Sequence, residues 1–430
     1  MRANSFSSLT AKATAVAAGA AAMLVLSTSH VGTSLAYAQP AKTAELAQGE
    51  YLARAGDCIA CHTARGGEPF AGGLGLPTPF GTFYTPNITP DAETGIGKWS
   101  ADDFWRALHE GRSKDGSLLY PAFPFPNYTK VTRADSDAIF AYIKSVKPVR
   151  KRNQPHAIGF PYNQRNLLLG WRALYFEVGE YTPHQTETTE WNRGAYLVQG
   201  LGHCDACHTS RNILGATKKD VQFAGGLIPL QDWYAPSLTS NREAGLGQWE
   251  VNDVVALLRA GVSKRGVVFG PMAQVVHDSL QYLTEIDTRA MAVYLKSLVQ
   301  DIGPTDPLQI RTTEVQIRAA YEAGAKIYED HCKSCHQANG TGVPPAYPPL
   351  ANNQAIAMEF AVNPIRMVLF GGFPPGTKGN PRPFGMPPFG QTLSDEQVAA
   401  VVTYIRQSWG NRGTAVNGAD VGKYRTVPVD

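Results

Sequence analysis

The sequence predicts a mostly α-helical, loop-rich protein built from three tandem domains. Three observations support this prediction: a C-x-x-C-H pattern occurs three times, the segments around it repeat, and each repeat ends with helical hydrophobic periodicity. The 430 residues include 42 glycines and 30 prolines, whereas only 17% are charged. This composition indicates compact domains with many ordered turns rather than coiled coils or long disordered tracts.

Residues 1–38 have the features of a cleavable export signal. Arg2 and Lys12 supply positive charge, residues 15–26 form a short apolar run, and residues 36–38 read Ala-Tyr-Ala, a small-residue cleavage site. A membrane anchor is the alternative, but the apolar run is shorter than a bilayer-spanning helix requires. We therefore expect this segment to be cleaved and the mature chain to be exported.

The charge balance excludes one class of partner. The formal net charge is +3, and loss of the signal removes two basic residues and no acidic one, which leaves the mature chain nearly neutral. A protein that binds nucleic acid needs a basic surface, so we expect no nucleic-acid partner. No segment after the signal has an apolar run long enough to cross a bilayer.

All six cysteines belong to the three C-x-x-C-H motifs. This pattern is the attachment signature of c-type haem, because two thiols one helical turn apart add to the porphyrin vinyl groups and the adjacent histidine binds the iron. The sequence therefore predicts three covalent haems c. The expected thioether partners are Cys58, Cys61, Cys204, Cys207, Cys332 and Cys335, and the expected proximal iron ligands are His62, His208 and His336.

Two other readings of the cysteines are less consistent with the pattern. A thiol redox pair needs no following histidine. A structural zinc site needs two C-x-x-C pairs close together, whereas these pairs lie far apart in the sequence. The predicted export also places the thiols where haem attachment and disulfide formation both occur.

The repeated flanks set the expected domain boundaries. Residues 86–99 read PNITPDAETGIGKW and residues 236–249 read PSLTSNREAGLGQW, so the first two units are closely related, while the third follows a plainer pattern. The expected order is an export signal at 1–38, a first domain at 39–150, a linker with an amphipathic helix at 151–190, a second domain at 191–300, a linker at 301–316, a third domain at 317–412 and a C-terminal tail at 413–430.

Each unit is expected to end in an amphipathic helix. Apolar residues recur at i, i+3, i+4 and i+7 in residues 134–146, 284–298 and 393–409, and Asp, Thr or Ser near each start suits an N-cap. A unit of roughly 100 residues buries only a modest core by itself. A bound porphyrin adds a large apolar surface, so we expect folding and haem attachment to be coupled.

The second axial ligand is expected to differ between the units. Met386 lies in a Pro- and Gly-rich loop before the last helix, and Met272 lies at the corresponding place in the second unit, so both are candidate distal ligands. The first unit has no methionine and carries Phe123 in this loop. Three possibilities remain open there: His109 binds the iron, His156 from the linker binds it, or the iron is five-coordinate with Phe123 near its open face.

The linker contains a candidate membrane-attachment helix. Residues 163–181 place apolar and aromatic side chains at helical spacing, with Arg165 and Arg172 beside that face. Such a helix lies in a membrane interface or packs between the first two units, and amphipathicity alone does not separate these cases. The face consists of Leu167, Leu168, Trp171, Leu174, Tyr175 and Val178.

The order of these segments resembles the three-haem cytochrome c subunit of membrane-associated, quinone-dependent dehydrogenases, such as the alcohol, gluconate, sorbitol and fructose dehydrogenases of bacteria. The matching segments include GEYLARAGDCIACHT, GAYLVQGLGHCDACHT, WYAPSLTSN, FGPMAQVVHDSLQYLT and LSDEQVAAVVTYIRQSWGN, and they cover nearly the whole mature chain. In this family the first-domain loop often reads Ala-Met-Pro, whereas here it reads Ala122-Phe123-Pro124. That departure also points to a related branch of cytochromes that serve molybdenum hydroxylases.

The resemblance implies three class I cytochrome c-like domains and an electron-transfer role. A separate dehydrogenase subunit, which oxidises an alcohol, a sugar acid or an aldehyde, would pass electrons through three haems to ubiquinone. The resemblance also implies a periplasmic location with peripheral attachment to the inner membrane. The alternatives are a cytochrome subunit of a molybdenum hydroxylase, a free periplasmic electron shuttle, or a haem peroxidase that uses an open first iron. We expect no catalytic residues, because the chain shows no dinucleotide motif and its paired acidic residues suit helix first turns.

Overall fold

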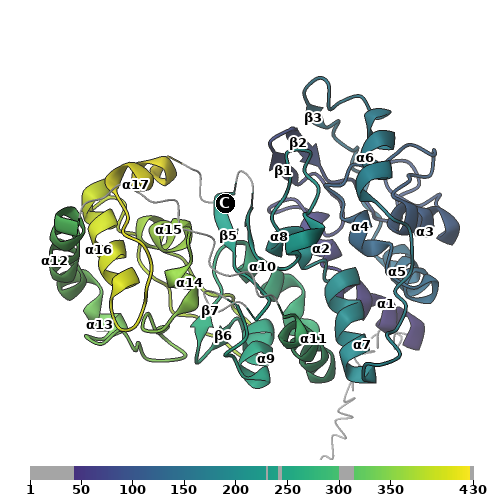
Figure 1. Cartoon of the computed structure of the whole chain (residues 1–430). Coiled ribbons are helices and arrows are strands. Elements are labelled where there is room, and N and C mark those ends of the chain that lie inside the picture. The colour runs from purple at the N-terminus through teal and green to yellow at the C-terminus, as the bar shows by residue number, and fades with distance from the viewer. Residues whose placement is uncertain (1–42, 229–230, 241–244, 300–313, 427–430) are drawn as a thin grey trace, which may run out of the picture. The chain divides into compact units, whose positions relative to one another are not determined.

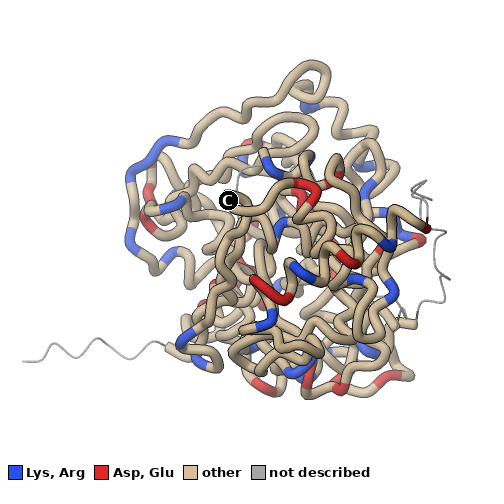
Figure 2. The backbone as a smooth tube through the Cα atoms, turned by 90° about the vertical axis from the view of Figure 1, so that its left-hand side faces the viewer, with Lys and Arg blue, Asp and Glu red and all other residues tan. Residues whose placement is uncertain are grey.

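The computed structural model describes residues 43–228, 231–240, 245–299 and 314–426 (Figure 1). The predicted export signal and most of the 301–316 linker lie outside these residues. Helices dominate the described part, with a few short antiparallel strands. Figure 2 shows basic and acidic residues interspersed along the chain, in agreement with a nearly neutral protein.

A crossing of two helices occurs three times. Helix α1 (Ala44–Ala55) packs on α5 (Arg133–Ser145), α7 (Thr189–Tyr196) packs on α11 (Glu285–Ser297), and α12 (Glu314–His331) packs on α16 (Asp395–Gln407). A glycine makes each close approach possible. A Cβ at Gly49, Gly194 or Gly324 would lie 2.0, 1.9 or 2.1 Å from a carbonyl oxygen of the facing helix, those of Ala138, Ala290 and Ala400.

The helices α5, α11 and α16 confirm the three predicted terminal helices. Their N-caps are Thr132, Thr284 and Ser394, whose hydroxyls each accept a hydrogen bond from a backbone N–H in the first turn. In α16 this contact forms a capping box with Gln397. Local chemistry therefore determines where these helices begin.

A short helix carries each C-x-x-C-H motif directly after the first helix of its repeat. These helices are α2 (Cys58–Cys61), α8 (Asp205–His208) and α13 (Lys333–His336), and a π-helical turn η1 (Leu197–Leu201) precedes α8. Strands β1 (Gly75–Thr78) and β2 (Gly81–Tyr84) follow the first motif, β4 (Gly226–Ile228) and β5 (Trp233–Ala235) follow the second, and β3 (Ala157–Ile158) pairs with β2.

The remaining elements connect these parts. They are α3 (Ala101–Glu110), α4 (Phe125–Tyr128), η2 (Lys219–Val221), α9 (Val251–Ala260), β6 (Val262–Ser263), β7 (Gly266–Val267), α10 (Pro271–Asp278), η3 (Leu280–Tyr282), α14 (Gln354–Ala357) and α15 (Val362–Phe370). A capping box with an aspartate at its third helical position opens both α3 and α9. The corresponding helices of the first two repeats therefore begin in the same way.

Two elements differ in extent from the sequence prediction. The linker helix α6 (Leu167–Tyr175) is shorter than the predicted 163–181 segment. The segment 413–430, expected as a tail, contains helix α17 (Gly418–Arg425), which packs on α16 through buried Val421. The Arg425 Nε also donates a hydrogen bond of 2.6 Å to Asp395 at the start of α16.

The buried apolar side chains form two main clusters. One extends through the first two repeats, from Leu52 to Leu295, and the other belongs to the third repeat, from Tyr328 to Val421. The first two repeats thus share one continuous core. Among the described residues, no helix is both long enough and apolar enough to cross a bilayer.

The glycine crossings give a stability test. We predict that Gly194→Ala destabilises the haem-loaded protein by about 1–3 kcal/mol, because the new methyl group has no room beside the Ala290 carbonyl. Denaturant unfolding measures this change. The matched control is Gly170→Ala in α6, where nothing lies within 4 Å of the added Cβ, so the better helix propensity of alanine should leave stability unchanged or raise it by up to about 1 kcal/mol. Equal effects of the two substitutions would contradict the close approach.

Candidate haem sites

Each of the three motif histidines makes the same type of hydrogen bond, from its ring to a proline carbonyl. The Nδ1 atom of His62 lies 2.8 Å from the carbonyl oxygen of Pro86, and the corresponding distances are 2.7 Å for His208 to Pro236 and 3.1 Å for His336 to Pro348. A carbonyl oxygen only accepts, so Nδ1 carries the proton and donates. The Nε2 atom of each ring is left with a free lone pair, which is the state that binds a metal ion.

Burial keeps these three imidazoles neutral. It lowers the pKa of His62, His208 and His336 below the ordinary value, although the hydrogen bond to the proline carbonyl opposes this shift in each ring. A neutral imidazole is the form that coordinates iron. The proline carbonyls were not identified from the sequence, although each proline begins or lies within a segment that follows its motif in all three repeats.

Five of the six cysteine thiols have a raised pKa. Burial raises the pKa of Cys58, Cys61 and Cys204 to about 12 and that of Cys332 to about 11, and it also raises the pKa of Cys207. The six form no disulfide. In the described part of the chain, no group of three or more His, Cys, Asp or Glu side chains could hold a metal ion by itself. These observations argue against a thiolate redox pair or a structural zinc site.

The residues present fit a covalent haem at each motif. In every motif the backbone N–H of the histidine donates to the carbonyl oxygen of the first cysteine, at 3.0 Å for His62 and 2.9 Å for His208 and His336. The two thiols and the histidine therefore lie on one helical turn, as attachment requires. The buried apolar side chains around them provide a dry surface for a porphyrin.

The candidate distal methionines lie in two different local structures. Met386 is held by its backbone, because its N–H donates to Gly372 at 2.8 Å and its carbonyl accepts from the Gly372 N–H at 3.0 Å. Met272 lies in the first turn of α10, directly after Pro271. Both side chains are half-buried and pack against the core of their own part of the chain.

The two histidine candidates of the first unit have other partners. The His109 ring stacks on Trp105 at 4.3 Å between centroids, and its Nδ1 lies 2.9 Å from the carbonyl oxygen of Thr129. His156 accepts a hydrogen bond of 3.1 Å at Nδ1 from the Tyr84 N–H, so its proton is on Nε2 in the neutral ring. His156 therefore presents no free lone pair at Nε2.

The first and second motifs lie close to each other. The pKa of Cys61 is raised first by burial and then, to a smaller extent, by Asp57 and by Cys207 of the second motif. Asn127 of the first repeat donates to Asp205 of the second motif at 2.5 Å and to the Gln199 carbonyl at 3.0 Å. These contacts connect the loop of the first repeat to the second motif helix.

A reciprocal pair of hydrogen bonds joins the first two repeats. The Tyr51 hydroxyl donates to Asp287 at 2.6 Å, and the Tyr196 hydroxyl donates to Asp135 at 2.5 Å. Each tyrosine belongs to the first helix of one repeat, and each aspartate to the terminal helix of the other. The two contacts differ in one respect: Arg193 also donates to both carboxylate oxygens of Asp287, at 2.8 Å each. The first two repeats therefore contact each other through equivalent surfaces, as two subunits related by a two-fold axis do.

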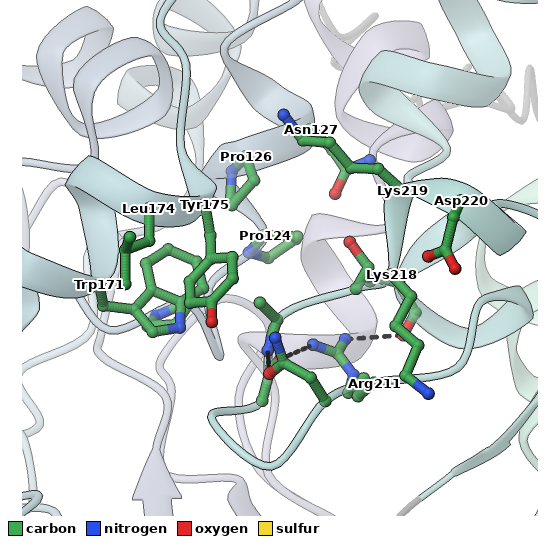
Figure 3. A pocket seen from close by; sticks show the side chains of 16 residues that line it. Pro124, Pro126, Asn127, Trp171, Leu174, Tyr175, Arg211, Lys218, Lys219 and Asp220 are labelled. Carbon is green, nitrogen blue, oxygen red and sulfur yellow. Dashed lines mark hydrogen bonds between the residues drawn. The ribbon is translucent and has the colours of Figure 1, made fainter.

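A cavity of about 350 Å³ borders the second motif. Trp171, Leu174 and Tyr175 of α6 line one side, and Arg211 and Lys218 lie on the other (Figure 3). The Arg211 guanidinium donates to the Ala206 carbonyl within the motif at 2.7 Å and to the Gly215 carbonyl at 2.6 Å. The volume lies within the range of about 300–1,000 Å³ typical of small-molecule sites. Sequence reasoning did not identify this cavity, because its walls come from segments that are separated along the chain.

Comparisons with known proteins agree with the site. The cytochrome c family profile matches residues 46–147 and 321–409. The chain is 40% identical to the cytochrome c subunit of the quinone alcohol dehydrogenase of Gluconobacter oxydans (strain 621H), over 92% of this chain and 85% of that protein. It is 41% identical to the gluconate 2-dehydrogenase cytochrome c subunit of Pantoea cypripedii, over 90% of both chains. It is 35% identical to the fructose dehydrogenase cytochrome subunit of Gluconobacter japonicus, over 88% of this chain and 82% of that protein.

The Asp287 contacts give a pH-dependent prediction. Burial alone would raise the pKa of Asp287, but the hydrogen bonds from Arg193 and Tyr51 outweigh it and lower the pKa. The stabilisation is therefore complete above the unfolded-state value of about 3.9 and is lost as the pH falls through the lower folded value. We predict that Asp287→Asn costs about 1–3 kcal/mol at pH 7.

Denaturant unfolding of the haem-loaded protein at several pH values measures this cost, and the difference from wild type should shrink below about pH 4. The matched control is Asp137→Asn, which breaks an exposed pair with Arg133 and should cost at most about 1 kcal/mol. A difference that stays constant down to the lowest pH would contradict the assignment.

Proposed function

The chain belongs to the family of cytochrome c subunits of quinone-dependent dehydrogenases, and we propose that it relays electrons through three covalent haems c to ubiquinone. The electrons come from a catalytic dehydrogenase subunit that oxidises an alcohol, a sugar acid or an aldehyde. The observation that carries this proposal is the repeated geometry of an Nδ1-protonated histidine beside two thiols. A second role as the cytochrome of a molybdenum hydroxylase uses the same chemistry with a different electron donor.

Each haem has a defined set of protein partners in this proposal. A haem c supplies reversible one-electron exchange between ferrous and ferric iron. The proline carbonyls fix the imidazole orientation, and the buried core limits access of water. The thioether partners are Cys58 and Cys61, Cys204 and Cys207, and Cys332 and Cys335; the proximal ligands are His62, His208 and His336; and the distal ligands of the second and third haems are Met272 and Met386.

The arrangement supports a relay within three tandem class I cytochrome c domains. The first two motifs lie side by side on one shared core, and hydrogen bonds connect the second repeat to the third. Among these, Trp249 donates to Gln354 at 3.1 Å, and Tyr234 and Asn363 exchange two hydrogen bonds of 2.9 and 2.8 Å. Such contacts hold the haem sites at fixed separations, which steady electron transfer requires.

The cavity beside the second motif supports a quinone as the final acceptor. One of its walls is aromatic and apolar, and the opposite side offers cationic donors for carbonyl oxygens (Figure 3). Reduction of a quinone to a quinol takes two electrons from two ferrous haems and two protons from water. Helix α6 forms both the cavity wall and an exposed apolar surface, so a quinone with an apolar tail can reach the cavity from a membrane.

Helix α6 also supports peripheral attachment to the periplasmic face of the inner membrane. Leu167, Leu169 and Leu174 are 57%, 56% and 69% exposed, whereas Leu168 is buried. Trp171 bonds to the Leu214 carbonyl at 3.0 Å. The helix therefore packs on the first two repeats through Leu168 and Trp171 and also exposes three leucines, which supports the membrane-interface alternative.

The relay is tested by removing one haem at a time. We predict that the paired change Cys332→Ser with Cys335→Ser, or the same change at either other motif, removes one haem mass from the denatured protein, starting from three. The reconstituted dehydrogenase complex should then lose quinone reduction by at least tenfold. A complex that retains full activity after any of these losses would place that haem outside the relay, and a wild-type mass with fewer than three haems would contradict the proposal.

Membrane attachment is tested by removing the exposed leucines. We predict that the triple variant Leu167→Ser, Leu169→Ser and Leu174→Ser weakens binding of the haem-loaded protein to lipid vesicles by at least about 100-fold, because each buried leucine contributes roughly 1.5–3 kcal/mol. Vesicle co-sedimentation measures the effect. The matched control changes three exposed apolar residues elsewhere, Ile286, Val299 and Val315, to serine. Equal weakening by both triple variants would exclude α6 as the attachment element.

A further inference from the structure

We propose that the first haem has no side-chain ligand on its distal face and binds a small uncharged ligand, such as carbon monoxide or nitric oxide, beneath Phe123. This inference rests on the proposed function, because it requires a haem on Cys58, Cys61 and His62. It concerns the loop of the first repeat, which lacks the methionine that the second and third repeats carry.

The structure places Phe123 against the first motif. A tight turn fixes the residue, since its N–H donates to the Tyr120 carbonyl at 3.0 Å and its carbonyl accepts from the Phe125 N–H at 2.7 Å. The Phe123 ring lies 5.3 Å from the Tyr128 ring. The Tyr128 hydroxyl in turn donates at 2.9 Å to the carbonyl of Gly56, two residues before Cys58. The loop therefore folds onto the polypeptide that carries the first haem.

Phe123 and Met272 lie in corresponding segments of the first two repeats. Phe123 lies just before α4 and Met272 in the first turn of α10, and each is half-buried and packs against the core shared by the first two repeats. That core also includes Cys58 and Ile59 of the first motif. A phenyl ring has no lone pair for iron, so the position that supplies sulfur in the second repeat supplies only an apolar cover in the first.

The first repeat offers no methionine sulfur. The sequence has no methionine between Met23 and Met272. The phenol of Tyr128 lies beside Phe123, and its hydroxyl donates to the Gly56 carbonyl. Burial raises the pKa of Tyr128 well above its ordinary value, so it stays protonated.

Neither histidine candidate takes this position. His156 carries its proton on Nε2, because Nδ1 accepts the Tyr84 N–H, and its ring contacts Phe83 and Tyr120 at the strand pair. His109 stacks on Trp105, and the Arg133 guanidinium lies 5.8 Å from the same indole. In the described part of the chain, the core around the first motif includes Phe104 and Leu108 of α3 but not Trp105. His109 is thus held on a side of α3 that differs from the one facing the motif.

The surroundings select the ligand class. The two side chains that lie together here are the Phe123 and Tyr128 rings. Neither ring carries a charge that could replace the hydration of an anion. An uncharged diatomic molecule avoids that cost and binds ferrous iron through one new iron–ligand bond, without oxidation or reduction of either partner. Because the Phe123 ring covers the distal side of the first haem without bonding to the iron, the distal coordination position stays available to such a ligand.

Carbon monoxide titration of the reduced, haem-loaded full chain tests the inference. We expect one carbon monoxide bound for every three covalent haems, measured by the absorbance change of the haem and its reversal by photolysis. The variant Phe123→Met should abolish this binding and convert the first haem to a low-spin spectrum. Met386→Ala is the positive control, because it opens the third haem and should raise the stoichiometry from one to two.

The opposite results are equally specific. Three covalent haems with no carbon monoxide bound would overturn this inference and leave the relay intact, whereas fewer than three haems in the same sample would contradict the relay itself. If His109 were the ligand, wild type would bind none and His109→Ala would bind one, which would also overturn it. Unchanged binding in Phe123→Met would show that Phe123 does not cover the iron.

Discussion

The hydrogen bond from a histidine Nδ1 to a proline carbonyl is the interaction on which each site depends. It assigns the proton to one ring nitrogen and directs the other, with its lone pair, into a buried space beside two thiols. Burial then keeps the ring neutral. Coordination of iron through Nε2 needs this tautomer. The backbone carbonyl oxygen of a proline therefore determines which ring nitrogen can bind the iron.

The fold serves to repeat this interaction and to bring two copies of it together. A glycine at each helix crossing lets the terminal helix pack closely on the first helix of its repeat, and the first two repeats share a single core. The reciprocal contacts of Tyr51 with Asp287 and of Tyr196 with Asp135 fix these repeats relative to each other. Electron transfer between fixed centres needs such rigidity, because the protein supplies only position, burial and ligands.

The sequence predicted the local features and missed the long-range ones. The motifs, the three terminal helices and their N-caps follow from neighbouring residues, so they could be read directly. The Pro86 carbonyl, the Arg193–Asp287 contact and the cavity beside Ala206 each join segments that are distant in sequence, and a single sequence carries no record of such contacts. Helix α17 was missed because the Asn417 cap and Val421 give little hydrophobic periodicity over so short a segment.

The account predicts three irons, each bound on one side by a motif histidine. The most direct test is an anomalous-difference X-ray map of the haem-loaded protein at the iron absorption edge. We expect three peaks, one beside the Nε2 atom of each of His62, His208 and His336, with every Nδ1 still bonded to its proline carbonyl. A map with fewer peaks, or with an iron at a different side chain, would contradict the central claim.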